Sequence, residues 1–277
     1  MARVSSQKHR ISIGSKHKRT GSHSRSELIW GIHPVTEALR FRPRAIREIF
    51  IHKDKPGHRL EQIIILAQSN GIPVRISSGR TGTDSDKPDQ PSEQERSQGV
   101  SARIVLPMLK LDDLLVKLKD SVNPPLLLAL DSIQDPHNLG AIIRSAVAAG
   151  ANAIILPKDR SVPVTGAVMK VSAGSVFHID ICRVTNLVNC LKMLKENGIW
   201  IFGATNAGDQ LVYDTDLTVP ACLVIGSEGK GLRPLVAEQC DLHIAIPMQS
   251  DLDSLNAAVA AGIILFETVR QRMAQSV

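Results

Sequence analysis

From residue 126 onward, the chain alternates short apolar runs with longer amphipathic stretches. Continuous apolar runs of five or six residues, bounded by Gly, Pro or polar residues, are typical of strands buried on both faces. The stretches between them have helical spacing, for example Leu139 to Ala149 and Ser254 to Arg272. This alternation predicts an α/β domain over residues 126–277 with a parallel sheet covered on both sides. The predicted strands are "LLLALD", "NAIILP", "VFHIDI", "IWIFGA", "ACLVIG" and "LHIAIP".

A smaller α/β domain is predicted over residues 27–106. "LIWGIHPVTEALR" has helical spacing, "RLEQIIILAQSNG" is a second predicted helix, and "IREIFIHK", "IPVRIS" and "GVSARIVL" are predicted strands. Residues 77–98 contain no apolar side chain apart from proline, so they predict a mobile loop. Residues 107–125 form a predicted linker, with an amphipathic helix in "LKLDDLLVKLKDS" and a stop at Pro124-Pro125.

The positive charge of the chain lies at its N-terminus. Residues 1–26 contain seven Lys or Arg and no acid, and subtracting these seven charges from the net charge of +6 leaves −1 for the remaining residues. A disordered basic tail of this kind is a common electrostatic contact with nucleic acid. Two alternatives stay open: a solvated tail without a role, and a Ser- and Arg-rich transit peptide, although the apolar face of such peptides is absent.

Several classes of protein are disfavoured. No apolar run approaches the roughly 18 residues that a membrane span needs, and the four cysteines are scattered without a C-x-x-C pair, which favours a cytoplasmic protein with buried thiols. We expect no metal, because no His, Cys or carboxylate cluster has ligand spacing. P-loop, Rossmann and nucleophile-elbow patterns are also missing. Aromatic residues make up 3% of the chain, which disfavours a base-stacking platform.

Three segments that follow predicted strands are rich in polar residues and glycine. They are "LDSIQDPHNLGAIIRSAVAAG", "IGSEGKGL" and "IPMQSDLDSLNAAVAAG". Ligands of open α/β sheets bind beyond the carboxyl ends of the strands, so these segments predict the site. "IGSEGKGL" has the glycines of a phosphate-binding loop, yet it carries an acid, Glu228, which disfavours a polyphosphate.

The same three segments, in this order and spacing, resemble the motifs of the SpoU/TrmH branch of the SPOUT RNA methyltransferases. The resemblance covers about Leu126 to Arg272 and is carried by "DPHNLGAIIRSAVAAGA", "LVIGSEGKGL" and "IPM" with "SLN". "WGIHPVTEAL" through "QGVSARI" resembles the L30e-like substrate-binding domain that precedes the catalytic domain in large-subunit rRNA guanosine 2′-O-methyltransferases. The resemblance implies a deep trefoil knot, S-adenosyl-L-methionine as the methyl donor, and a homodimer whose active site lies at the subunit interface.

The resemblance also implies a set of site residues. The catalytic set comprises Asn138, Arg144, Glu228, Ser254 and Asn256, and backbone around Gly226, Ile246 and Leu255 would bind the cofactor. Each has a plainer interpretation from sequence alone: Asn138 or Ser254 as a helix N-cap, Arg144 as a solvated charge and Glu228 as an exposed loop acid.

Arg144 follows Asn138 by almost two helical turns, so we expect both on one side of the helix, with Glu228 holding the guanidinium. Because a guanidinium rarely loses its proton, we expect Arg144 to bind a phosphate and stabilise alkoxide charge rather than act as the base.

The sequence therefore predicts S-adenosylmethionine-dependent methylation of a ribose 2′-hydroxyl, of a guanosine in 23S ribosomal RNA. Alternatives are a tRNA 2′-O-methyltransferase, a base methyltransferase of another SPOUT branch, and a non-catalytic RNA-binding factor. The presence of all five residue types of the catalytic set favours the enzyme over the last of these.

Overall fold

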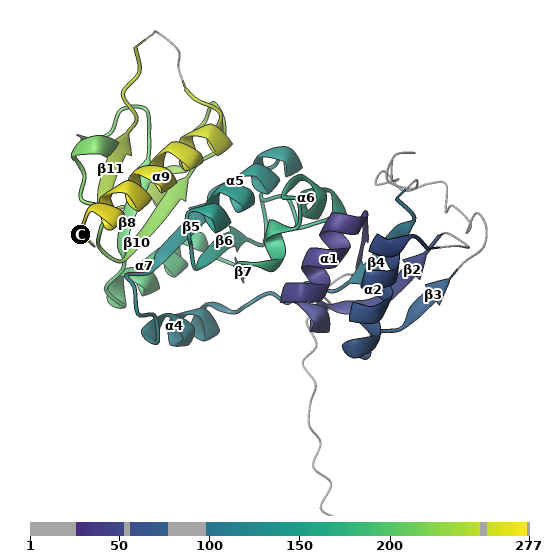
Figure 1. Ribbon diagram of the computed structural model, residues 1–277. Coiled ribbons are helices and arrows are strands. Elements are labelled where there is room, and N and C mark those ends of the chain that lie inside the picture. The colour runs from purple at the N-terminus through teal and green to yellow at the C-terminus, as the bar shows by residue number, and fades with distance from the viewer. Residues whose placement is uncertain (1–25, 53–55, 77–97, 250–253, 276–277) are drawn as a thin grey trace, which may run out of the picture.

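The structure is a computed structural model that describes residues 26–52, 56–76, 98–249 and 254–275 (Figure 1). The predicted basic tail and the predicted loop over residues 77–98 lie outside the described residues, except for one residue of each. The described chain builds two sheets, one of four strands and one of seven. No helix in this part of the chain combines the length and the apolar character that a membrane span requires.

The first sheet has the strand order β1-β4-β2-β3. Both β1 and β2 run antiparallel to β4, and β3 runs parallel to β2. Two helices cover one face of this sheet and bury its alternate apolar residues, because successive side chains of a strand point to opposite faces. The elements are β1 (Glu27–Trp30), α1 (Ile32–Phe41), β2 (Ile46–Ile51), α2 (His58–Ser69), β3 (Val74–Ile76) and β4 (Val100–Ile104).

The start of this unit corrects one prediction. "LIW" is not part of a helix but of β1, and α1 begins only at Ile32. Gly31 separates the two with a φ of 106°, a value that favours glycine and interrupts the helix. Because β1 exists through its pairing with β4, more than seventy residues later, spacing within the segment could not reveal it.

The predicted linker helix is confirmed as α4 (Leu111–Lys119). Its buried residues Leu114, Leu115 and Leu118 pack under the second sheet. The backbone just before it is tied to that sheet, because the amide of Leu109 donates to the carbonyl of Ile181 at 2.8 Å.

The second sheet has the order β7-β6-β5-β10-β8-β11-β9, and its strand pairs are parallel, as predicted. Its strands are β5 (Leu126–Leu130), β6 (Ala153–Pro157), β7 (Asp180–Val184), β8 (Trp200–Ala204), β9 (Gln210–Leu211), β10 (Ala221–Ile225) and β11 (Leu242–Ala245). Its helices are α5 (Pro136–Ala148), α6 (Gly166–Val171), α7 (Leu187–Glu196), α8 (Pro234–Ala237) and α9 (Ala257–Gln275).

Strand β5 shows why both faces of this sheet are apolar. Leu126, Leu128 and Leu130 join the cluster formed with α5, α6 and α9, whereas Leu127 and Ala129 join the cluster formed with α4, α7 and α8. All five residues are buried, so the strand reads as a continuous apolar run instead of an alternating one.

One local prediction was wrong in this sheet, and one short strand was missed. The run "VFHIDI" begins with a 3₁₀ turn at Ser175–Phe177, and β7 starts only at Asp180. Val176 and Phe177 are buried by tertiary packing, so their apolar character did not indicate a strand. The short strand β9 was not predicted. The trefoil knot implied by the resemblance stays a prediction.

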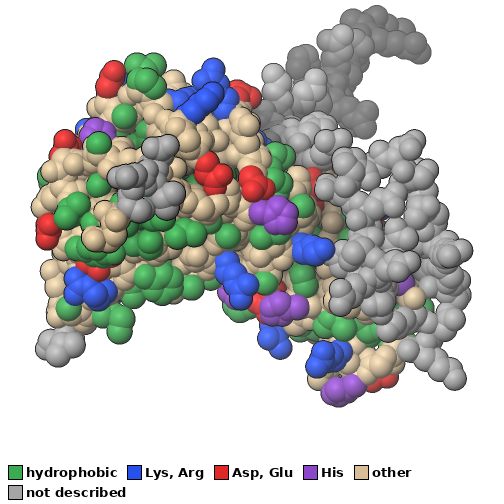
Figure 2. All heavy atoms as spheres, turned by 90° about the horizontal axis from the view of Figure 1, so that it is seen from above, with side chains coloured by type: hydrophobic (Ala, Val, Ile, Leu, Met, Phe, Trp, Pro, Cys, Tyr) green, Lys and Arg blue, Asp and Glu red, His purple; other side chains and the backbone are tan. Residues whose placement is uncertain are grey.

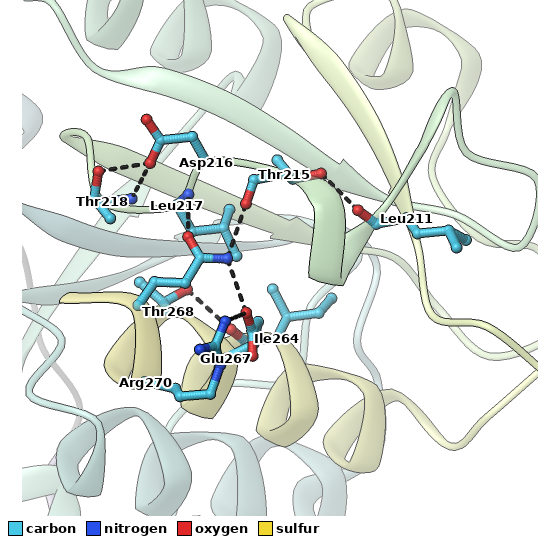
Figure 3. A network of polar contacts seen from close by, with 10 residues as sticks. Leu211, Thr215, Asp216, Leu217, Thr218, Ile264, Glu267, Thr268 and Arg270 are labelled. Carbon is cyan, nitrogen blue, oxygen red and sulfur yellow. Dashed lines mark hydrogen bonds and ion pairs between the residues drawn. The ribbon is translucent and has the colours of Figure 1, made fainter. Parts of the chain in front are cut away.

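Helix α9 is anchored to the segment between β9 and β10 (Figure 3). The side chain of Gln271 donates to the carbonyl of Thr215 at 2.9 Å and accepts from the amide of Leu217 at 2.8 Å. The nearly buried Glu267 accepts from both Gln271 and Arg270. These contacts hold the helix along the sheet, so the residues at its N-terminus have a defined place.

Candidate active site

The three predicted segments follow β5, β10 and β11. In the sheet, β5 and β10 are neighbours, and β8 lies between β10 and β11. Since all of them are parallel, their carboxyl ends lie at one edge of the sheet. The three segments therefore meet at this edge.

The segment after β10 folds into a tight loop. Ser227 and Gly231 exchange two backbone hydrogen bonds of 3.1 and 2.9 Å, which close the loop around Glu228. Gly229 and Gly231 have φ of 74° and 62°, and a Cβ on Gly226 would lie 2.2 Å from the carbonyl carbon of Gly231. Glycine is therefore needed at these positions for conformation and space, and the loop presents the Glu228 carboxylate at its tip.

Glu228 meets one asparagine from each of the other two segments. Its Oε1 accepts from Nδ2 of Asn138 at 2.9 Å and from Nδ2 of Asn256. Asn256 Nδ2 also donates to Oδ1 of Asn138 at 2.9 Å. The backbone amide of Ala257 adds a longer contact of 3.4 Å to the same carboxylate oxygen. Three predicted site residues, far apart in sequence, thus form one polar cluster.

The helix caps are made by residues other than those considered from the sequence. Asp135 caps α5 by accepting from the amide of His137 at 2.8 Å, which leaves Asn138 free for the cluster. Asn256, not Ser254, caps α9, because its Oδ1 accepts from the amides of Ala258 and Val259 at 2.9 and 3.3 Å. Ser254 is exposed and makes no hydrogen bond to the cluster within the described part of the chain.

Arg144 does not occupy the place expected from its spacing. It is exposed on α5 and forms no ion pair with Glu228, and the two asparagines hold the carboxylate instead. The reason is helical geometry: six residues at 3.6 per turn rotate Arg144 by roughly 120° away from Asn138. The expected contact between Arg144 and Glu228 is therefore wrong within one chain, and the catalytic role of Arg144 stays a prediction.

A buried ion pair that was not predicted supports two of the segments. Asp131, directly after β5, is fully buried, and its carboxylate accepts from the backbone amide and from Nε of Arg233 at 2.8 and 2.6 Å. Because Arg233 ends the glycine loop, this pair fixes the loop to the segment that carries Asn138. The sequence does contain a signal for this ion pair: Asp131 directly follows an apolar run, and a carboxylate that is buried there requires a cationic partner.

An open cavity of about 580 Å³ borders the polar cluster. Asn138 and Glu228 lie in its wall, together with the exposed cations Arg160 and Lys230 and with the ion-paired Arg233. A cavity that combines a carboxylate–amide cluster with several cations suits a ligand that carries both hydroxyl groups and phosphates. Arg160 and Lys230 were not predicted as site residues.

The predicted cofactor residues lie at the same edge of the sheet. Gly226 follows β10 and Ile246 follows β11, and both are half-buried, as is Leu255 before α9. Between β10 and β11, Thr205 follows β8, and its hydroxyl is buried without a hydrogen-bond partner among the described residues. A buried polar atom without a partner is costly. This orphaned hydroxyl fits a polar nucleoside bound at this edge.

The cysteine thiols are unreactive because they are buried. Burial raises the pKa of the Cys190 and Cys240 thiols to about 12 and that of the Cys182 thiol to about 11, so these residues are protonated at neutral pH. Three of the four cysteines are fully buried, as expected. Over the described ranges, no group of three or more His, Cys, Asp or Glu is placed to bind a metal.

Two protein families match the chain. Residues 125–266 match the SpoU rRNA Methylase family, and residues 28–107 match the family described as RNA 2′-O ribose methyltransferase substrate binding. The 23S rRNA (guanosine-2′-O-)-methyltransferase RlmB of Yersinia pestis is 40% identical over 247 residues, which are 89% of this chain and 98% of that protein. RlmB of Escherichia coli K12 is also 40% identical over 247 residues, which are 89% of this chain and 99% of that protein.

Solved structures show the same architecture. The SpoU methyltransferase AviRb of Streptomyces viridochromogenes, in complex with the cofactor AdoMet, has a TM-score of 0.74 and 26% identity, over 90% of this chain and 91% of that chain. An AdoMet-bound rRNA methyltransferase of Sinorhizobium meliloti has a TM-score of 0.70 and 27% identity, over 89% of this chain and 87% of that chain.

Proposed function

Because the chain belongs to the SpoU rRNA Methylase family, we propose that it methylates the ribose 2′-hydroxyl of a guanosine in 23S ribosomal RNA, with S-adenosylmethionine as the methyl donor. The observation that carries this proposal is the cluster of Asn138, Glu228 and Asn256 beside a cavity with cationic walls. The activity named for the relatives from Yersinia pestis and Escherichia coli supports guanosine and 23S rRNA as the target.

The cofactor would be held at the edge formed by the ends of β8, β10 and β11. Gly226 lets the loop after β10 fold tightly at this edge. Ile246 and Leu255 supply half-buried apolar surface, and the orphaned hydroxyl of Thr205 offers a hydrogen bond. When bound, S-adenosylmethionine supplies a methyl group on a sulfonium, which is a good leaving group. The protein then has to align the ribose hydroxyl and stabilise the charge that develops on it.

Within the cluster, the carboxylate of Glu228 accepts hydrogen bonds from two amide side chains, which fix its orientation. An oriented carboxylate favours the cationic sulfonium nearby. Asn138 uses one N–H on Glu228, so its second N–H is available to a ribose oxygen. Arg160 and Lys230, at the mouth of the cavity, would bind the neighbouring phosphates.

We place Arg144 in a site shared between two copies of the chain. Val259, Phe266 and Met273 are exposed at intervals of seven residues along α9, so they form one apolar stripe on the helix that packs against α5. Figure 2 shows hydrophobic side chains gathered on the C-terminal part of the molecule, where α9 lies in Figure 1. A homodimer through this stripe would cover it. The exposed Arg144 on α5 of one copy would then lie near the polar cluster of the other copy, where it would bind a phosphate or the charge of the ribose alkoxide. We propose that the enzyme is cytoplasmic.

The proposal is tested by mapping alkali-resistant linkages in 23S rRNA that has been incubated with the protein and S-adenosylmethionine. A 2′-O-methyl group removes the nucleophile of alkaline cleavage, so we expect one protein-dependent resistant linkage 3′ to a guanosine. A methyl label recovered on a base, on tRNA alone, or on no RNA would overturn the proposal. Sedimentation of the free protein tests the homodimer separately, because a monomer at micromolar concentration contradicts it.

A further inference from the structure

The first sheet has a second face, opposite α1 and α2. The buried residues Ile29, Ile49 and Ala102 point toward the helices. Their strand neighbours point the other way. These are Leu28 and Trp30 on β1, Glu48 and Phe50 on β2, and Ser101 and Arg103 on β4, with His52 directly after β2. Glu48 lies opposite Arg103 in the register and forms an ion pair with Arg75. This outer face therefore gathers three of the few aromatic or imidazole rings of the first domain.

The rings on the outer face are arranged in parallel planes. The ring centroids of Trp30 and His52 are 5.0 Å apart with an interplanar angle of 18°. Phe50 and His52 are 6.5 Å apart with an angle of 17°. The guanidinium carbon of Arg103 lies 5.6 Å from the centroid of Phe50. Trp30, Phe50 and His52 are each half-buried, so part of every ring stays accessible, and Arg103 is exposed.

His52 is held in place in a neutral form. Its Nε2 is 2.9 Å from the hydroxyl of the buried Ser101, which lies between Trp30 and Phe50 in the strand register. Burial lowers the pKa of His52, so the ring is uncharged at neutral pH and stacks as an aromatic surface. Ordinary cross-strand packing accounts for adjacent rings. What matters for a ligand is that the guanidinium of Arg103 stays exposed beside these rings.

We propose that this outer face binds an unpaired segment of the substrate RNA, with a base stacked on Trp30 or Phe50 and a phosphate bound by Arg103. The combination of nearly parallel rings and a guanidinium is the chemistry that recognises single-stranded RNA without reading its sequence. The proposal rests on the proposed function, since it says how the same substrate is held outside the catalytic domain. The low overall aromatic content disfavoured such a platform, but a small sheet needs only two or three rings to form one.

The chain offers a direct probe, because it contains two tryptophans, Trp30 and Trp200. Trp200 is 53% exposed and begins β8, at the edge of the second sheet opposite the active site. In a Trp200→Phe variant, Trp30 is the sole tryptophan. We expect an unpaired RNA oligonucleotide to quench its fluorescence saturably, with the same midpoint as in fluorescence anisotropy. Binding by anisotropy without any quenching would overturn the proposal.

Affinity gives a second, independent test. Trp30→Leu should weaken RNA binding about 5- to 150-fold, the range for the loss of one stacked base, whereas the matched control Trp200→Leu should not change it. Arg103→Gln, which removes only an exposed charge, should weaken binding and reduce the salt dependence by about one phosphate contact. Because Arg103 is exposed, this variant tests the face even if Trp30→Leu does not fold.

The outcomes separate this proposal from the proposed function. If the wild-type protein methylates rRNA, but Trp30→Leu and Arg103→Gln bind RNA as tightly as Trp200→Leu, the outer face has no role and the methyltransferase assignment stands. Calorimetric titration with S-adenosylmethionine should give the same Kd for all variants, since the outer face is not part of the cofactor edge. A changed cofactor Kd in Trp30→Leu would point to a folding defect and contradict a local role.

Discussion

At the scale of single residues, the site depends on one oxygen atom. Oε1 of Glu228 accepts from Asn138 and Asn256, and the amide of Ala257 adds a longer contact. Asn256 in turn caps α9 with its own oxygen. The Glu228 carboxylate therefore fixes the side-chain orientations of both asparagines. A substitution of Glu228 would disturb the site without changing the hydrophobic core.

Glu228→Gln tests this dependence. Glutamine keeps the size of the side chain but brings an NH₂ group that opposes the donors of the two asparagines if it faces them. We expect a loss of methyl transfer of about 100-fold or more, with a thermal midpoint close to that of the wild type, because Glu228 is exposed. Initial rates with labelled S-adenosylmethionine and calorimetric melting measure the two effects. The control is Glu238→Gln, a change at an exposed acid after α8 that should leave the rate unaltered.

Arg144→Lys tests whether the exposed Arg144 binds a phosphate or the alkoxide charge during methyl transfer. Lysine keeps the charge but loses the planar fork that binds a phosphate or an alkoxide through two hydrogen bonds. We expect the catalytic rate to fall roughly 100-fold and the stability to stay within about 0.5 kcal/mol, as for a surface substitution. Single-turnover rates at saturating RNA measure this. If rate and RNA affinity were both retained, Arg144 would be an ordinary solvated charge.

At the scale of elements, two glycines on neighbouring helices have opposite surroundings. A Cβ on Gly140 of α5 would lie 2.6 Å from Cβ of Val171 on α6, so this glycine permits close helix packing. On α9, a Cβ at Gly262 would have one neighbour within 4 Å among the described residues, the hydroxyl of Ser145 at 3.9 Å. The two positions look alike in sequence, since both lie inside helices rich in alanine.

Gly140→Ala and Gly262→Ala therefore make a matched pair. Gly140→Ala should lower the free energy of unfolding by about 1–3 kcal/mol, because the added methyl group overpacks the α5–α6 contact. Gly262→Ala should raise the free energy of unfolding of the monomer by up to about 1 kcal/mol, since alanine favours a helix more than glycine does. Urea denaturation of both variants measures the difference. Equal effects at the two positions would mean that the α5–α6 contact does not limit packing.

At the scale of the whole molecule, one carboxylate joins three parts of the chain. Asp180, at the start of β7, is 7% exposed and accepts from Arg42, which follows α1, at 2.7 Å. It also pairs with Lys117 of the linker helix α4. The first domain, the linker and the catalytic sheet thus meet at Asp180, which helps to fix the orientation of the outer face relative to the active site.

The pKa of Asp180 leads to a pH-dependent prediction. Burial alone would raise this pKa, but hydrogen bonds and charges from Lys117 and Arg42 outweigh burial and lower it. A lowered carboxyl pKa stabilises the fold above the ordinary value near 4, and this stabilisation is lost as the pH falls through the folded-state pKa. Asp180→Asn should therefore cost about 2 kcal/mol at pH 7, and the difference from wild type should shrink below roughly pH 4.

Chemical denaturation between pH 3 and pH 8 measures this difference. Asp159→Asn is the matched control, because Asp159 is an exposed acid after β6. The free energy of unfolding of this variant should equal that of the wild type at every pH. If the difference in the free energy of unfolding between wild type and Asp180→Asn stayed constant down to pH 3, the charge of the Asp180 carboxylate would not be what stabilises the fold.

The sequence by itself determined the class of fold and the edge of the sheet at which the polar cluster lies. Runs such as Leu126–Leu130 are apolar because the strand is buried on both faces, and that pattern is local. In a parallel sheet, every segment that follows a strand is brought to the same edge. Polar residues after three apolar runs therefore predicted the edge of the sheet that carries the site, and the resemblance to the SpoU/TrmH motifs selected Asn138, Glu228 and Asn256 within these segments.

Only the tertiary structure decided which partners these residues have. Glu228 is held by asparagines rather than by Arg144, β1 exists because β4 pairs with it, and the rings of Trp30 and His52 stack across a strand that lies between them. Each of these contacts joins residues far apart in the chain. Its energy depends on distance and direction in space, and no local spacing of residue types encodes either.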